Sequence, residues 1–340
     1  LNWKLLENGK VVSEGSIADI NINPRDTATF DLQSKIASLL KGEHEYFINF
    51  SAQTRTESVA LPKGHEIAKD QFLIQEVKSV SENIVSEKTA LKLKETTDEI
   101  SISGDGFSVR FDNKKGQLVS YKLNDEELLE APLELCFWRA PTDNDYGSFM
   151  GQAKKKAKSH ASHAINWMTA WDDATLSSTS ITDTLNCIVV QFNHELTSVS
   201  AKHSSSFTIS ADGHVQVQNQ LLLKANSDIP RYGMRLAIPN EYRTVNWYGR
   251  GPHENYSDRK FAAHVGLYES LVDSMYFPYI RPQENGYHTD TRWLKLLNES
   301  GNGIQIEANK TICFSALPNP LEDFQGNSVA YKGSRHTIDV

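Results

Sequence analysis

The feature that most constrains the fold is a pattern of short segments in which apolar and polar residues alternate between turn residues. Phe207-Thr208-Ile209 alternates before the dipeptide Asp212-Gly213, and Val215-Gln216-Val217-Gln218 alternates after it. Successive side chains of a strand point to opposite faces, so Val215 and Val217 would share one face and the two glutamines the other. Asp-Gly is a favoured hairpin dipeptide. The segment therefore predicts two antiparallel strands.

Other segments carry the same kind of signal. The turn Asn8-Gly9 separates Trp3-Lys4-Leu5-Leu6 from Val11-Val12, and the segment 46–50 combines aromatic and β-branched residues. Further on, residues 107–111 and 118–121 flank a loop that contains Gly116. Strand-forming residues between such turns predict an all-β fold. Only the segment from Gly151 to Ala170 has a weak helical pattern.

The length of the chain, 340 residues, favours more than one domain. Closely spaced short strands up to about residue 75 predict a small immunoglobulin-like sandwich. Residues 76–97 are rich in Ser, Glu, Lys and Thr, and we interpret them as a boundary of edge strands or linker. The rest predicts one large β-sandwich. We therefore expect domains at residues 1–95 and 96–340.

Charge and cysteine content exclude several classes of function. The net charge of −8 and the isoelectric point near 5.8 argue against nucleic-acid binding. No apolar run approaches the roughly 20 residues that span a bilayer, so no membrane partner is expected. Cys136, Cys187 and Cys313 form no CxxC pair, which argues against a zinc site and a disulfide framework.

Two segments mix Trp, Arg, Asp, Asn, Pro and Gly, and we interpret them as well-ordered loops: residues 137–147 and 245–259. Glycoside hydrolysis needs two carboxyl groups, which Asp143, Asp145 and Glu254 could supply. These carboxylates could instead hold the loops together through Arg139, Arg250 or backbone amides, and we favour this interpretation. The full spacing of a calcium loop is absent, so no metal site is predicted.

Aromatic residues crowd the last third of the chain. The segment from Arg281 to Trp293 adds Asn, Glu and Arg to Tyr287 and Trp293. Sugar sites combine aromatic faces, which stack on the pyranose ring, with polar side chains for the hydroxyls. A packed core also uses Trp and Tyr, and both interpretations stay open from composition alone.

Several stretches, in order, resemble the C-terminal region of large β-galactosidases of glycoside hydrolase family 2. They are GHEIA at residues 64–68 with DQF at 70–72, WRAPTDND at 138–145, VNWYGRGPHENYSDR at 245–259, MY at 275–276 with PY at 278–279, and PQENG at 282–286. Together they extend over most of the chain.

The resemblance implies a domain picture and a division of labour. Residues 1–95 would form an immunoglobulin-like β-sandwich, and residues 96–340 a large β-supersandwich similar to galactose mutarotase. In the family, the two catalytic glutamates and a divalent metal, Mg²⁺, belong to an upstream barrel, so neither catalytic residue nor cofactor is expected in this chain. The implied partners are a β-galactoside, the upstream catalytic domain and, in a homo-oligomer, further copies. A cytoplasmic and a periplasmic location both stay open.

The resemblance also implies roles for particular residues. Trp293 would form a wall of the sugar cleft, with Arg292, Glu284, Asn285 and His288 beside it. A structural role in the two loops is implied for a second group, which comprises Arg139, Asp143, Asp145, Glu254 and Arg259. The family's Gly-rich closing stretch is not found before Val340, so one or two closing strands are expected to be missing.

Two alternatives stay open from sequence. The chain could be a stand-alone carbohydrate-binding sandwich, or a mutarotase-like aldose epimerase. The epimerase would need a histidine and a glutamate that face one pocket, for which His253, His288 and Glu284 are the candidates.

Overall fold

The computed structural model describes residues 1–18, 20–77, 91–142, 145, 166–184, 186–224, 229–280, 283–325 and 335–340. Strands dominate these residues, and the prediction of an all-β fold is confirmed. The short helical elements are α1 (Gln33–Ile36), η1 (Ala37–Leu39), η2 (Thr197–Val199), α4 (Val272–Met275) and η3 (Leu321–Gln325), and residues 166–168 are also helical. The weak helical pattern at 151–170 lies outside the described residues up to position 165.

The small N-terminal domain is built on one antiparallel sheet in the order β2-β1-β3-β4. Its strands are β1 (Asn2–Glu7), β2 (Lys10–Ser16), β3 (Tyr46–Gln53) and β4 (Glu66–Gln75). The predicted hairpin at Asn8-Gly9 is confirmed, because Glu7 pairs with Lys10 across the two-residue turn. Both turn residues have positive φ, 47° and 81°, which is the backbone conformation that Asn-Gly favours.

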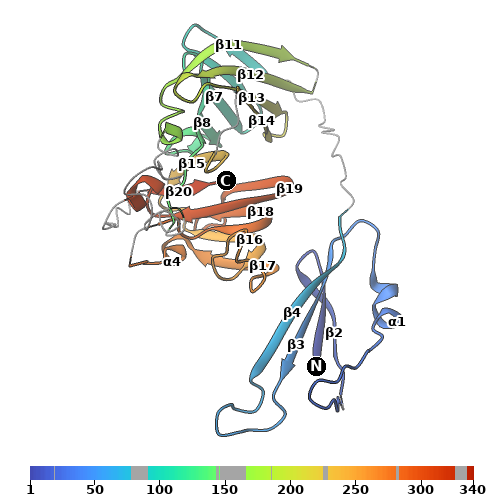
Figure 1. The fold of residues 1–340 in the computed structure, drawn as a ribbon. Coiled ribbons are helices and arrows are strands. Elements are labelled where there is room, and N and C mark those ends of the chain that lie inside the picture. The colour runs from blue at the N-terminus through green and yellow to red at the C-terminus, as the bar shows by residue number, and fades with distance from the viewer. Residues whose placement is uncertain are drawn as a thin grey trace, which may run out of the picture.

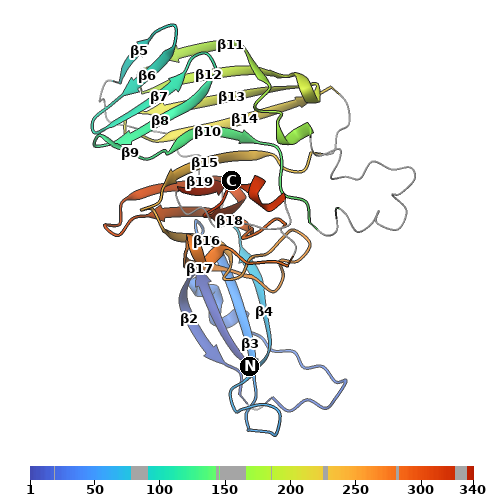
Figure 2. The ribbon, with the colours of Figure 1, turned by 90° about the vertical axis from the view of Figure 1, so that its left-hand side faces the viewer.

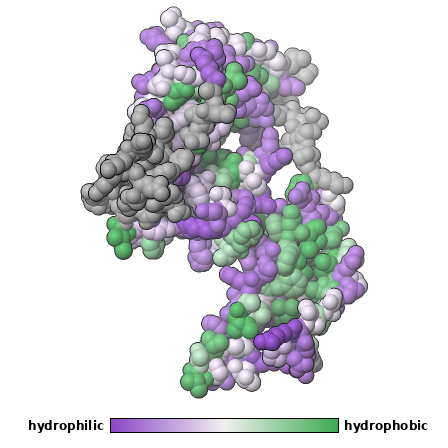
Figure 3. Space-filling view, in the orientation of Figure 1, coloured by the Kyte–Doolittle hydropathy of each residue, from purple (hydrophilic) through white to green (hydrophobic). Residues whose placement is uncertain are grey.

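One face of this sheet packs on the connecting segment between β2 and β3. Trp3, Leu5 and Ile48 form a buried cluster with Ile36 of α1. The described residues up to 77 supply this one sheet, and a second sheet of the predicted immunoglobulin-like sandwich is not formed by them. Apolar side chains therefore stay partly uncovered: Phe72 is 51% exposed, and Figure 3 shows an apolar area on this domain.

Two smaller sheets form the outer part of the large domain. The five-stranded sheet has the order β5-β6-β7-β8-β9, with β5 (Lys92–Glu95), β6 (Glu99–Ser103), β7 (Phe107–Asp112), β8 (Gln117–Leu123) and β9 (Glu126–Glu127). The four-stranded sheet has the order β11-β12-β13-β14, with β11 (Ala174–Asp183), β12 (Cys187–Leu196), β13 (Ala201–Ser210) and β14 (Val215–Leu223). The predicted hairpin at Asp212-Gly213 joins β13 to β14.

The expected boundary between residues 95 and 96 would cut β5 from its partner β6, so the change of domain falls between β4 and β5.

A seven-stranded sheet lies between these two sheets and the small domain (Figures 1 and 2). Its order is β10-β15-β20-β19-β18-β16-β17, with β10 (Ala131–Cys136), β15 (Gly233–Pro239), β16 (Thr244–Gly251), β17 (His264–Leu271), β18 (His288–Leu297), β19 (Gly303–Leu317) and β20 (Arg335–Asp339). The edge strand β17 contacts β4 of the small domain.

One hydrophobic core joins the three sheets of the large domain. Phe111 of β7 meets Phe192 of β12 and Phe207 of β13, at 5.7 and 5.1 Å between ring centroids. The same core continues through Trp247 and Leu294 of the seven-stranded sheet. Each fully buried side chain of this size typically contributes about 1.5–3 kcal/mol, so the three sheets stabilise one another.

The prediction that residues 245–259 form a loop is wrong for their first half, which is the strand β16. Its Trp, Tyr, Arg and Gly content resembles a loop, but the burial pattern has period 2 at its start. Gly249 is needed for packing, because a Cβ there would lie 2.5 Å from Oγ1 of Thr291 on β18. The glycine thus marks a close approach of two strands.

Candidate functional site

The five predicted sugar-cleft residues come from one segment, 284–293, but the structure divides them into two groups. Glu284, Asn285 and His288 lie in and next to the loop that leads into β18, and all three are buried. Arg292 and Trp293 lie further along β18, on the side that faces the small domain.

Glu284 is the centre of a buried polar cluster, here called the Glu284 cluster: Arg139, Asp145, Arg231, Tyr256 and Glu284. Its Oε2 lies 3.3 Å from Nε of Arg139 and accepts a hydrogen bond of 3.1 Å from the Tyr256 hydroxyl. Arg231 donates to the other oxygen. Burial raises the pKa of Glu284 above its ordinary value, against the pull of Arg231 and Arg139.

Asp145 joins this cluster through Arg139. The guanidinium donates two hydrogen bonds to the Asp145 carboxylate, at 2.7 and 3.1 Å, and the Thr142 amide adds a third at 2.7 Å. Burial works to raise the pKa of Asp145, but the bonds to Arg139 and Thr142 outweigh it and hold the pKa below its ordinary value. Asp143, the other carboxylate of this loop, lies outside the described residues.

Glu254 and Arg259 belong to the turn after β16. Arg259 donates to Oε1 of Glu254 at 3.0 Å, and the Gly286 amide donates to Oε2 at 2.9 Å. Tyr279 donates to the same carboxylate. Glu254 therefore connects the turn to the loop that carries Glu284.

Asn285 and His288 are held from within the protein. The side chain of Asn285 accepts the Phe277 amide at 2.8 Å and donates to the carbonyl of the same residue. The His288 ring stacks on Phe314, with centroids 5.1 Å apart, and meets Trp247 edge-on at 4.9 Å. Burial lowers the pKa of His288, which keeps the ring neutral near pH 7. A mutarotase-like site would need His288 and Glu284 open to one pocket, and both are buried in separate contacts.

Arg292 and Trp293 lie where the two domains meet. We call this region the interdomain joint: Leu6, Glu45, Phe47, Gln71, Tyr248, Val265, Arg292 and Trp293. Arg292 donates to both oxygens of the buried Glu45, at 3.0 and 2.5 Å, and the Tyr248 hydroxyl donates to the same carboxylate. The Trp293 ring packs with Tyr248, at 6.4 Å between centroids, in the apolar part of the joint.

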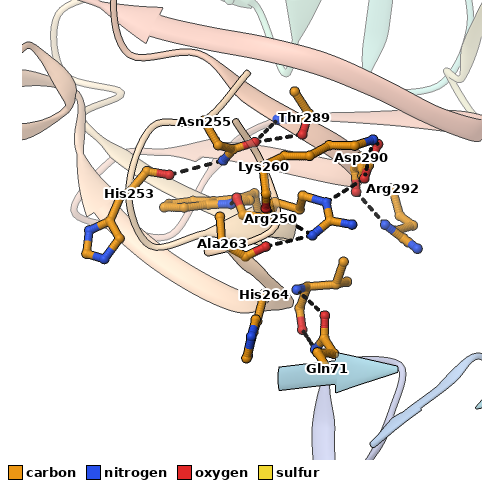
Figure 4. A network of polar contacts seen from close by, with 12 residues as sticks. Gln71, Arg250, His253, Asn255, Lys260, Ala263, His264, Thr289, Asp290 and Arg292 are labelled. Carbon is orange, nitrogen blue, oxygen red and sulfur yellow. Dashed lines mark hydrogen bonds and ion pairs between the residues drawn. The ribbon is translucent and has the colours of Figure 1, made fainter. Parts of the chain in front are cut away.

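A pocket of about 260 Å³ lies beside the joint, lined by both domains. The Asp290 carboxylate accepts hydrogen bonds from Nε of Arg250 at 2.5 Å and from Nζ of Lys260 at 3.1 Å (Figure 4). Gln71 of β4 reaches across to Val265, with one hydrogen bond to its carbonyl at 2.8 Å and one from its amide at 2.7 Å. The charges of Arg250, Lys260 and Asp290 are thus paired within the protein.

Sequence reasoning missed the small-domain half of the joint. Glu45 lies in the stretch Gly42-Glu43-His44-Glu45, where nothing distinguishes it from a solvent-exposed acid. The Asn8-Gly9 turn lies next to Glu45, since the Asn8 side chain accepts a hydrogen bond from the Glu45 amide at 3.0 Å. That contact is set by tertiary structure and has no counterpart in local sequence.

The comparisons with known proteins agree with this architecture. A family model described as "Beta galactosidase small chain" matches residues 103–337, and one described as "Beta-galactosidase, domain 4" matches residues 1–75. The chain belongs to the β-galactosidase family. The predicted resemblance is therefore confirmed for both parts of the chain.

Individual β-galactosidases match nearly the whole chain. The relative from Priestia megaterium is 28% identical over 322 residues, which are 94% of this chain and 30% of the relative. Those from Streptococcus thermophilus and Vibrio cholerae are 27% and 31% identical and cover 97% and 82% of this chain. The chain spans about 30% of the length of these curated relatives.

The part of the chain that the structure describes contains neither a candidate metal-binding cluster nor a candidate membrane-spanning helix. There, no group of three His, Cys, Asp or Glu side chains is placed to hold a metal ion. None of the described helices has the length and apolar character needed to cross a membrane. The sugar-cleft and loop-holding roles of the predicted residues stay predictions.

Proposed function

We propose that this chain is the C-terminal, non-catalytic region of a β-galactosidase that hydrolyses terminal β-D-galactosides. The observation that carries the proposal is the ordered match of two β-galactosidase family models to residues 1–75 and 103–337. The chain would support the fold of the intact enzyme and line its sugar cleft. A β-galactoside, the upstream catalytic domain and further copies in a homo-oligomer are its proposed partners.

The carboxylates of the described structure support a non-catalytic role. Glycoside hydrolysis needs one carboxyl group as acid and a second as nucleophile or base, on either side of the scissile bond. Glu284 is bound by two arginines and Tyr256, and Asp145 is bound by Arg139. Such carboxylates hold loops in place. The catalytic pair, and the Mg²⁺ implied by the family, are assigned by this proposal to the upstream region.

The five cleft candidates would contribute in different ways. Glu284, Asn285 and His288 are buried, so they would shape the loop before β18 from inside. Arg292 and Trp293 have their contacts at the interdomain joint, so their effect on a sugar would be less direct. Arg139, Asp145, Glu254 and Arg259 would hold the surrounding loops through the ion pairs described above. For Asp143 the same role is proposed from sequence alone.

The test compares the intact protein with this 340-residue chain. We expect the intact protein to release nitrophenol from nitrophenyl β-galactoside and the chain alone to release none above the buffer rate. Nitrophenyl β-glucoside is the control for sugar specificity. Hydrolysis by the chain alone would contradict the non-catalytic role. An intact protein without activity on the galactoside would contradict the assignment as a β-galactosidase.

A further inference from the structure

The interdomain joint depends on an irregularity in β18. In regular pairing, Tyr248 of β16 lies opposite Trp293, and Trp247 lies opposite Leu294. Trp247 and Leu294 point into the core, so Tyr248 and Trp293 point to the other face, toward the small domain. Regular alternation would turn Arg292 to the core side. The pairing of β18 with β19 shifts register between His288 and Thr291 and again between Thr291 and Trp293, and at this irregularity, here called the bulge, both Arg292 and Trp293 reach the joint.

Asp290 holds the bulge in place. Its φ is 51°, a left-handed conformation that Asp adopts more readily than most residues. Its carboxylate binds Arg250 and Lys260, and its carbonyl accepts a hydrogen bond from Arg292. Arg292 is thus oriented from its own strand before it meets Glu45. Bulges of this kind often redirect a side chain to a functional position.

The small domain presents the matching surface. The Asn8-Gly9 turn positions Glu45, because the Asn8 amide also donates to the Glu45 carbonyl at 2.9 Å. Gly9 allows the turn to approach the large domain closely, since a Cβ there would lie 2.9 Å from a ring carbon of Tyr248 and 2.9 Å from Cγ of Leu267. The guanidinium of Arg292 lies over the Phe47 ring at 5.6 Å. The joint therefore consists of apolar side chains around the buried Glu45 carboxylate, which accepts hydrogen bonds from Arg292 and Tyr248.

From these contacts we propose that Arg292 and Trp293 are positioning residues, which fix the small domain against the large sandwich and act on the sugar only through that placement. The inference rests on the proposed function, because it concerns the sugar cleft of the intact β-galactosidase. Contacts between domains of one chain resemble transient protein interfaces, and relative motion is the default unless specific contacts prevent it. Glu45, Gln71 and the bulge supply such contacts here.

The experiment uses the intact protein and three single variants: Trp293→Ala, Gln71→Ala and Glu45→Gln. Glu99→Gln is the matched control, since Glu99 pairs with Arg110 on the five-stranded sheet. Hydrogen exchange of residues 264–271 and 288–297 reports the joint, because the Val265 amide is protected by Gln71. The Michaelis constant for nitrophenyl β-galactoside reports the cleft, and small-angle scattering reports domain placement.

We expect all three joint variants to speed exchange at residues 264–271 at least tenfold and to change the Michaelis constant in the same direction. Glu99→Gln should change neither quantity. The inference is overturned if Trp293→Ala alone changes the Michaelis constant while exchange at the joint stays as in the wild type. That result would place Trp293 against the sugar. If the intact protein hydrolyses no galactoside, the proposed function fails, and exchange with scattering still decides whether Trp293 holds the joint.

Discussion

Glu45 and Glu284 are both buried carboxylates that accept hydrogen bonds from arginine and tyrosine, but they lie in different settings. Glu284 is bound by Arg139, Arg231 and Tyr256, all from the large domain. Glu45 is bound by one arginine and one tyrosine that belong to the other domain. If the Glu284 cluster loses a partner, its carboxylate stays trapped in the sandwich. If the joint loses a partner, the domains can separate and water can reach Glu45.

The largest effect is therefore expected in the Glu284 cluster. Arg231→Met removes a buried cation from Glu284 and from Asp339, which lies 3.9 Å away. Removal of one partner of a buried pair typically destabilises by about 3–5 kcal/mol. We expect a loss of this order in the free energy of unfolding of the chain, measured by urea denaturation and followed by near-UV circular dichroism.

Glu284→Gln should be milder than Arg231→Met. Burial raises the pKa of Glu284, so the folded protein already disfavours its ionised form, and a neutral amide of the same shape loses less. Arg259→Met is the control for Arg231→Met, because the Arg259 side chain is 53% exposed in its pair with Glu254. Equal losses for Arg231→Met and Arg259→Met would show that burial does not distinguish these arginines.

A smaller effect is expected at the joint. Arg292→Met leaves Glu45 with Tyr248 as its partner, and an unsatisfied buried acceptor typically costs about 1–3 kcal/mol. Separation of the domains hydrates Glu45, so the loss cannot exceed the free energy with which the domains dock. We expect faster hydrogen exchange at residues 264–271 and an unchanged melting temperature of the large domain. If Arg292→Met lowered the melting temperature as far as Arg231→Met does, the joint and the Glu284 cluster would not differ in how strongly they stabilise the large domain.

Much of the architecture could be predicted from local sequence. The turns Asn8-Gly9 and Asp212-Gly213, with alternating residues on both sides, indicated the hairpins that the structure contains. Backbone conformation at such turns is determined by the turn residues themselves, so local sequence is sufficient. The family stretches then indicated what the two parts of the chain belong to.

The sites were harder to predict because partners far apart in sequence decide them. The pairs Glu45–Arg292 and Arg231–Glu284 are separated by 247 and 53 positions. β16 was interpreted as a loop because its polar and glycine content matches a turn, while its close packing on β18 is visible only in three dimensions. The face of β18 to which Arg292 points depends on the bulge, and no clear feature of the local sequence indicates that bulge.

The smallest effect concerns Asp290, which connects the bulge to the pocket beside the joint. Burial works to raise its pKa, but hydrogen bonds from Arg250 and Lys260 outweigh it and hold the pKa below the ordinary value of 3.8. A carboxylate whose pKa is lower in the folded state stabilises the fold above its ordinary pKa. That stabilisation is lost as the pH falls through the lowered value. The joint should therefore weaken in acid, below about pH 4.

Asp290→Asn separates charge from conformation, because Asn also tolerates the positive φ of this position. The pairs are partly exposed, so we expect the variant to lose roughly 1 kcal/mol or less at pH 7. The difference from the wild type should stay constant down to pH 5 and shrink at pH 3, as measured by urea unfolding at each pH. A constant difference at all three values would mean that the charge of Asp290 does not stabilise the bulge. Arg292 would then be oriented by backbone geometry alone, and the joint would be insensitive to acid at this position.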